Sequence, residues 1–155
     1  KFIATNIPRR YAKMVHKEGF KALKKIERKE KKYFAPLPIR YDENIRCYKK
    51  MLGMSMHRGK GANKNLPKAQ AVKDATMAHF ILENYKKGTK FIHYNGAYHS
   101  DRKEGIIWHL KMAEKDIKVA NISTVLQEDV NELAKENVNK GDFIICVPES
   151  MATTY

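Results

Sequence analysis

The stretch PKAQAVKDATMAHFILENYKKGTKFIHYNGAYHS, residues 67–100, decides the fold class of this chain. Pro67 suits the first turn of a helix, where its missing N–H costs no internal hydrogen bond, and the helical pattern continues towards Tyr85. The Lys-Lys-Gly sequence at 86–88 has the charge and the backbone freedom typical of a helix C-terminus. Residues 90–94 then have the pattern of a strand. A helix that leads directly into a strand indicates an α/β protein.

The same alternation extends to both ends of the chain. Asn6-Ile7-Pro8 predicts a helix that follows a strand and reaches about Glu18, with Asn6 as the cap. Helices are also expected over residues 106–113 and 128–137. We therefore predict an α/β fold with a mainly parallel sheet flanked by helices, in which the last strand is buried. The predicted strands lie near residues 2–6, 90–94, 118–124 and 143–147, with the first two adjacent or separated by one strand.

Length and composition set the expected organisation. With 155 residues, 43% of them hydrophobic, the chain can build one packed core, and we expect a single domain over residues 1–155. The sequence begins at Lys1 and enters a strand-like run at once, so we expect it to be the C-terminal portion of a longer, N-terminally truncated domain. Such a sheet would have an exposed edge, and a homodimer that covers this edge is expected.

The charge of the chain predicts an anionic partner. The formal net charge is +14, and Lys1 to Lys32 alone holds 12 basic and 3 acidic residues, a net +9. Nucleic acid, acidic lipid headgroups and ligands with carboxylates all match this charge. Nucleic acid is the least expected, because the aromatic residues are not interleaved with the basic ones and no nucleic-acid-binding motif is present.

Ligands of parallel α/β sheets bind in the loops beyond the carboxyl ends of strands. Two segments qualify here, residues 6–11 (Asn-Ile-Pro-Arg-Arg-Tyr) and residues 95–100 (Asn-Gly-Ala-Tyr-His-Ser). In the second, Gly96 allows a sharp turn, and Tyr98 and His99 carry the phenol and the imidazole that bind haem iron or other transition metals. In the first, Arg9 and Arg10 can form bidentate pairs with carboxylates such as haem propionates.

Helical spacing adds a polar stripe to this end of the predicted sheet. Gln70, Asp74 and Met77 share one face of the helix, and an acid and an amide among apolar neighbours need partners. We expect Asp74 to hydrogen-bond His99 and to fix its imidazole. The glycine-rich residues 53–65 are expected to form a loop that closes over the ligand.

Three ordered motifs resemble one known family. Asn-Ile-Pro-Arg-Arg-Tyr at 6–11, Ala-Gln-Ala-Val-Lys-Asp-Ala-Thr-Met-Ala at 69–78, and Tyr-Asn-Gly-Ala-Tyr-His-Ser at 94–100 resemble, in order and spacing, the ChaN-like haem-binding uptake proteins of the Tiki and erythromycin-esterase-like group. The family's Gly-Glu-x-His motif and first strands do not occur in this sequence, which implies that the intact protein supplies further ligands. The resemblance implies that a cleft is lined or supported by Asn6, Arg9, Arg10, Gln70, Asp74, Gly96 and His99.

The same resemblance implies a function in bacterial iron uptake. Its members are iron-regulated envelope lipoproteins, some of which bind haem through a tyrosine in paired subunits; here the candidate tyrosines are Tyr98, Tyr11 and Tyr94, in that order. We therefore expect a haem- or iron-binding protein rather than an enzyme, as a homodimer in the bacterial cell envelope, with any lipid anchor outside this chain. The alternative is a metal-dependent hydrolase that uses His99 and Asp74 with a divalent metal.

Overall fold

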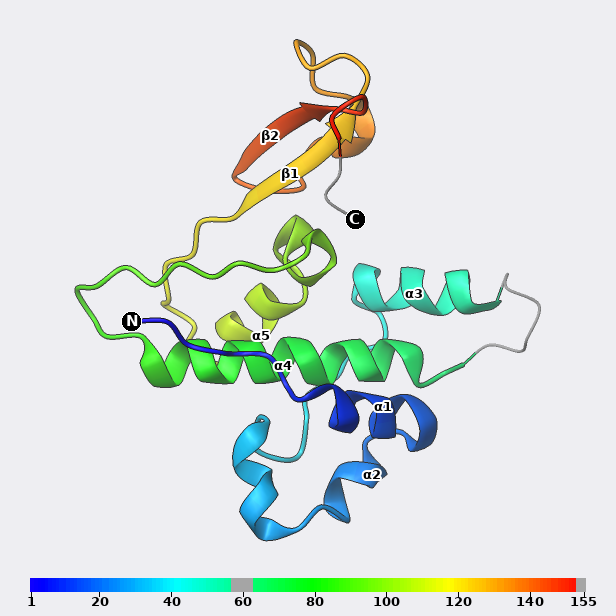
Figure 1. The fold of residues 1–155 in the computed structure, drawn as a ribbon, viewed down its shortest axis with the longest axis vertical. Helices are drawn as coiled ribbons and strands as arrows, with labels where there is room; N and C mark the ends of the chain where they lie inside the picture. The colour runs from blue at the N-terminus through cyan, green and yellow to red at the C-terminus, as the bar shows by residue number, and fades with distance from the viewer. Residues whose placement is uncertain (57–62, 153–155) are drawn as a thin grey trace.

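The computed structural model describes residues 1–56 and 63–152. It is a helical body from which a small β-lobe projects (Figure 1). The elements, in chain order, are α1 (Arg9–Glu18), α2 (Lys21–Lys24), the 3-10 helix η1 (Arg28–Tyr33), α3 (Arg46–Met56), α4 (Leu66–Asn84), η2 (Ala97–His99), η3 (Asp101–Lys103), α5 (Ile106–Ala113), β1 (Ile122–Gln127), η4 (Lys135–Asn137) and β2 (Phe143–Pro148).

Helix α4 is the centre of the fold. Pro67 lies in its first turn, as the sequence predicts, and the structure places Asn65 at its N-cap. The helix packs against α1, α3 and α5. Because neighbours surround it, α4 buries small apolar residues on several faces instead of along one stripe. A polar side chain on such a helix must find its hydrogen bonds inside the protein.

Two apolar clusters use different parts of α4. The first joins α1 and α2 to the segment after η1, with Tyr11 packed edge-on against Phe34 at a centroid distance of 5.4 Å. The second joins the C-terminal half of α4 to α5, through Met77, Ile81 and Leu110. The clusters fix α1 and α5 to α4, and with them the loops that lead into these helices.

The predicted α/β class is confirmed in a coarse form, as helices with a parallel sheet of two strands. Strands β1 and β2 pair in parallel, with Ile122 opposite Phe143 and Gln127 opposite Pro148. Asn121 and Ser123 link the lobe to the helical body, because Asn121 Nδ2 donates to Ser100 O and Ser123 Oγ donates to Asp101 Oδ1. The single domain over residues 1–155 stays a prediction.

Two predicted strands are wrong. Residues 2–6 and 90–94 form no strand, because a strand requires a ladder of backbone hydrogen bonds and none joins these segments in the described parts of the chain. Both run along α4 (Figure 1), and they do meet, through the hydrogen bond between Thr5 Oγ1 and His93 Nε2 at 2.8 Å. Asn6 also does not cap α1, whose N-cap is Pro8.

The predicted helix over residues 128–137 is also wrong, and only η4 forms there. Gln127 explains this, because its side-chain amide donates to the backbone oxygens of Asp129 and Glu132, and its Oε1 accepts from Asn137 Nδ2. Asp129 Oδ1 in turn accepts from the backbone N–H of Asn131. Side chains of this kind compete with the helix for the backbone polar groups.

Two further expectations need correction. The strand predicted as buried is largely open, with Phe143 64% and Ile145 51% exposed, because two strands cannot cover both of their own faces. In the segment predicted as a closing loop, residues 53–56 belong to α3, and residues 57–62 lie outside the described residues. Among the helices described, none is both long and apolar enough to cross a membrane.

Candidate functional site: a histidine held by a buried carboxylate

Asp74 is the most deeply buried charged group near the predicted ligand loop. Its side chain is fully enclosed within the body, one turn after Gln70, which is also buried. An unpaired carboxylate in such a place would be several kcal/mol unfavourable. Its partners therefore define the site.

Both carboxylate oxygens of Asp74 have a partner from another element. Oδ1 lies 2.5 Å from Nδ1 of His99, and Oδ2 accepts the hydroxyl of Tyr48 at 2.9 Å. Burial raises the pKa of Asp74, while the hydrogen bonds from His99 and Tyr48 act to lower it. The predicted hydrogen bond between Asp74 and His99 is thus present.

His99 ends the short helix η2, and two side chains of α4 contact its ring. The side-chain amide of Gln70 lies 2.9 Å from Nδ1, beside the Asp74 contact. Because the carboxylate accepts at Nδ1, the proton of the neutral ring is held there and Nε2 keeps its lone pair. The side chain is 17% exposed, so the ring is anchored at one edge and reachable from solvent.

Gly105 lets the loop after His99 pass close to this pair. Its φ of +54° and ψ of −118° lie in a region that side chains rarely adopt. A Cβ at this position would overlap the carbonyl oxygen of His99 and would lie 3.3 Å from Asp74 Oδ2. Glycine is therefore required here both for the backbone conformation and for space.

Tyr48 and His109 extend the network beyond the predicted residues. Tyr48 comes from α3 and His109 from α5, and the Tyr48 hydroxyl lies 3.5 Å from His109 Nε2. Burial raises the pKa of Tyr48, and it lowers the pKa of His109 to about 4, with a smaller contribution from Arg40. His109 interrupts an otherwise apolar run, Ile106-Ile107-Trp108, which is the sequence signal that marks it as a buried imidazole.

The residues predicted in the first loop lie elsewhere. Arg10 donates to the Tyr11 hydroxyl at 2.7 Å and to Glu30 at 3.0 Å, and Tyr11 is a core residue, 2% exposed. Asn6 and Arg9 are exposed. Within the described residues, no hydrogen bond or ion pair joins these four side chains to His99. The structure therefore brings together Gln70, Asp74 and His99 from the predicted set.

Tyr98 and Gly96 lie next to the histidine but do not share its network. Tyr98 is 40% exposed, and its hydroxyl donates to the sulfur of Met54 at 3.5 Å. Gly96 has a φ of −67°, which any residue adopts, and a Cβ there would meet nothing within 4 Å. The turn at Gly96 thus does not depend on glycine.

The described residues around His99 offer a single imidazole at the surface of the site. Over residues 1–56 and 63–152, no group of three or more His, Cys, Asp or Glu side chains is placed to hold a metal ion. Asp74 has both oxygens occupied, and Nε2 of His99, which lies 3.4 Å from the side-chain nitrogen of Gln70, is the ring nitrogen that does not contact the carboxylate. If a haem were bound here, His99 would be the residue to hold its iron, and the porphyrin would supply the other nitrogen ligands.

Comparison with known proteins identifies the family of the chain. The family described as "Haem-binding uptake, Tiki superfamily, ChaN" matches residues 1–110, which include every residue of the Tyr48–Asp74–His99 network and His109. No curated protein and no solved structure matches the chain. The match covers more than two thirds of the sequence, and the chain belongs to the ChaN family of haem-binding uptake proteins in the Tiki superfamily.

Proposed function

We propose that this protein binds haem, with Nε2 of His99 as an axial ligand of the iron. The observation that carries this proposal is the hydrogen bond between His99 Nδ1 and the buried carboxylate of Asp74. A carboxylate behind a ligating histidine fixes the tautomer, directs the ring and increases the basicity of the free nitrogen. The family to which the chain belongs supports the choice of haem over other iron species.

The charge of the chain supports the same ligand. Residues 1–110 contain 26 basic and 9 acidic residues, a net +17, whereas residues 111–155 contain 5 basic and 8 acidic residues, a net −3. Haem carries two propionate groups, and a positive field attracts it to the part of the chain that holds His99. Tyr98, next in sequence, is the alternative donor to iron.

We further propose that the bound haem or iron enters a bacterial uptake pathway at the cell envelope, and that the protein acts as a homodimer. The family description supports an uptake function. Sedimentation of the haem-free and haem-bound protein tests the dimer, and fractionation of the native host tests the location.

Titration with haemin tests the binding proposal. The chain should develop a saturable Soret shift at one haem per protomer. The His99→Ala variant should bind at least about tenfold more weakly, because the oriented axial ligand is lost. His16→Ala is the matched control, since His16 is an exposed histidine on α1, and it should bind as the unaltered chain does.

Two outcomes would reject the proposal. One is the absence of a saturable Soret change. The other is a stoichiometric divalent metal in the purified protein together with a hydrolytic activity that His99→Ala abolishes, which would favour the metal-dependent hydrolase.

A further inference from the structure

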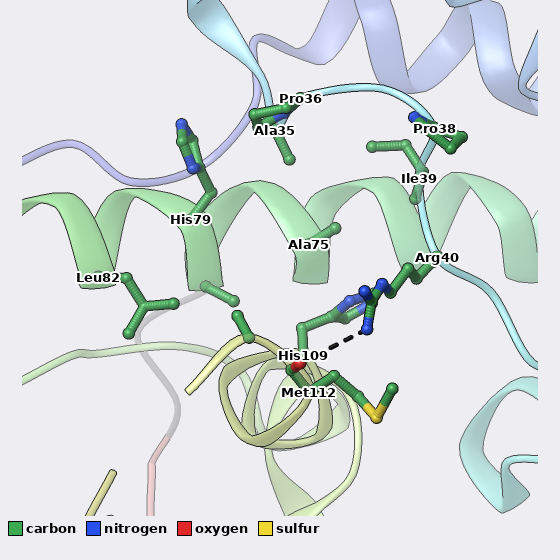
Figure 2. A pocket seen from close by; sticks show the side chains of 12 residues that line it. Ala35, Pro36, Pro38, Ile39, Arg40, Ala75, His79, Leu82, His109 and Met112 are labelled. Carbon is green, nitrogen blue, oxygen red and sulfur yellow. Dashed lines mark hydrogen bonds between the residues drawn. The ribbon is translucent and has the colours of Figure 1, made fainter. Parts of the chain in front are cut away.

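A cavity of about 230 Å³ lies between the segment of residues 35–40, α4 and α5 (Figure 2). Since a water molecule occupies roughly 30 Å³ in the liquid, the cavity has room for about seven waters or a molecule of similar size. It is smaller than the sites that usually hold drug-sized ligands. It therefore cannot enclose a haem, and it is distinct from the proposed iron site.

The walls of the cavity are mainly apolar. Ala75 lies between Leu82 at one end and Ile39 and Met112 at the other (Figure 2), and Ala78 of α4 also lines the cavity. Such walls favour a hydrocarbon group over a bare inorganic anion. The polar side chains at the cavity determine which polar groups the ligand must also have.

Arg40 supplies a positive charge at this cavity. Its side chain lies beside the ring of His109 (Figure 2), and its hydrogen bond is a long one, 3.5 Å from Nη1 to the backbone oxygen of Met112. No carboxylate in the described parts of the chain lies within ion-pair distance of Arg40. A guanidinium has five N–H donors in a planar fork that matches a carboxylate, so most of its donors are available to a ligand.

His109 supplies an acceptor in the same cavity. The residue is 7% exposed, and its Nε2 faces the Tyr48 hydroxyl. Because Tyr48 donates its proton to Asp74, its oxygen can only accept from His109, which places the His109 proton on Nε2 and the lone pair on Nδ1. Within the described residues, Nδ1 has no hydrogen-bond partner. Every fully buried side-chain nitrogen there has a partner, so Nδ1 is not fully buried and is open to solvent.

We propose that this cavity is a second binding site, for a short-chain hydroxycarboxylate of about four carbons. The carboxylate pairs with the guanidinium of Arg40, and the hydroxyl donates to Nδ1 of His109. The alkyl part packs against Ala75 and Ala78. This arrangement uses the unpaired cation, the unpaired acceptor and the apolar walls together, and it goes beyond the proposed haem site.

Calorimetric titration of the whole chain with three four-carbon compounds tests the proposal. 3-Hydroxybutanoate carries both polar groups, butanoate lacks the hydroxyl, and 1,3-butanediol lacks the carboxylate. 3-Hydroxybutanoate should bind with 1:1 stoichiometry. Butanoate should bind about two- to tenfold more weakly, because one neutral hydrogen bond is lost, and the diol at least about tenfold more weakly, because the charged pair is lost.

Two variants show whether the binding belongs to this cavity. Arg40→Gln should weaken 3-hydroxybutanoate at least about tenfold, since amide donors replace the charged fork. Arg28→Gln, at an exposed arginine of η1, is the matched control and should leave the affinity unchanged. The thermal midpoints of the two variants should agree with that of the unaltered chain, because both side chains are exposed.

Each of the opposite results overturns the proposal. One such result is the absence of saturable heat with 3-hydroxybutanoate up to about 10 mM, which corresponds to negligible affinity. The others are that the diol binds as tightly as 3-hydroxybutanoate, or that Arg40→Gln and Arg28→Gln lose the same affinity for it. Equal binding of butanoate and 3-hydroxybutanoate would also overturn it, because the hydroxyl would then make no bond to His109. Because the haem titration is independent of these measurements, failure of one proposal leaves the other standing.

Discussion

Replacing Gly105 by alanine should destabilise the protein and disturb His99 at the same time. The strained φ and ψ of this position would cost an alanine about 1–3 kcal/mol in the free energy of unfolding. The added Cβ would also overlap the carbonyl oxygen of His99, so the loop must move away from Asp74. Weakening a charged, buried hydrogen bond adds about 1.5–3 kcal/mol, which brings the expected loss to roughly 2.5–6 kcal/mol.

Two other glycines separate these contributions. Gly88 has a φ of +85° and open space around it, so Gly88→Ala has the conformational cost alone, about 1–2 kcal/mol. Gly96 has an ordinary φ and open space, and Gly96→Ala should change stability by less than about 0.5 kcal/mol. Urea unfolding of the three variants gives the free energies, and haemin titration gives the affinities.

The expected order of destabilisation is Gly105→Ala, then Gly88→Ala, then Gly96→Ala. Only the first should lower the haem affinity, by about 10- to 100-fold, as other losses of support behind a ligand do. Equal destabilisation by Gly105→Ala and Gly88→Ala, with unchanged haem binding, would refute the close packing of Gly105 against His99.

Three further predictions concern the buried groups around Asp74. The pKa of His109 is about 4 in the fold against an ordinary 6.5, so its contribution to stability is complete above pH 6.5 and is lost as the pH falls towards 4. Between pH 7.5 and 4.5 the unaltered chain should therefore lose roughly 2–3 kcal/mol more than His109→Gln in the free energy of unfolding. Equal losses by urea unfolding would contradict this. The raised pKa of Asp74 acts in the opposite direction and is common to both proteins. Tyr48→Phe should cost about 1–3 kcal/mol in thermal or urea unfolding, because it leaves one oxygen of Asp74 unpaired in the interior, and a change below about 0.5 kcal/mol would argue against that bond. Burial, and then the nearby Glu104, raise the pKa of the Cys47 thiol to about 12. Iodoacetamide at pH 8 should therefore alkylate this thiol at least about 100-fold more slowly in the folded than in the unfolded chain. Similar rates would show that the thiol is open to solvent.

The sequence was sufficient for the parts of the fold that depend on local pattern. The position of Pro67 in the first turn of α4 and the extent of α5 follow from helical spacing and helix-end residues. The contact between Asp74 and His99 could also be predicted, because a buried acid on a helix needs a partner and the nearby loop offers an imidazole.

The features that the local sequence pattern did not predict are those that depend on contacts between residues distant in sequence. Residues 2–6 and 90–94 have the composition of strands, but a strand forms only with a neighbouring ladder, which a one-dimensional pattern does not reveal. Tyr48 belongs to α3, and its hydroxyl reaches Asp74 only because α3 packs against α4. Arg10 was expected at the ligand, but its guanidinium instead donates to the Tyr11 hydroxyl and to Glu30.

The most direct test of the central claim is whether a histidine nitrogen binds the iron. Pulsed electron paramagnetic resonance of the ferric haem complex, with the protein labelled with ¹⁵N-histidine, detects that nitrogen through its hyperfine coupling. The account predicts a histidine coupling in the unaltered chain and in Tyr98→Phe, and its loss in His99→Ala. A coupling that persists in His99→Ala, or one that is absent from the unaltered chain, would contradict the role assigned to His99.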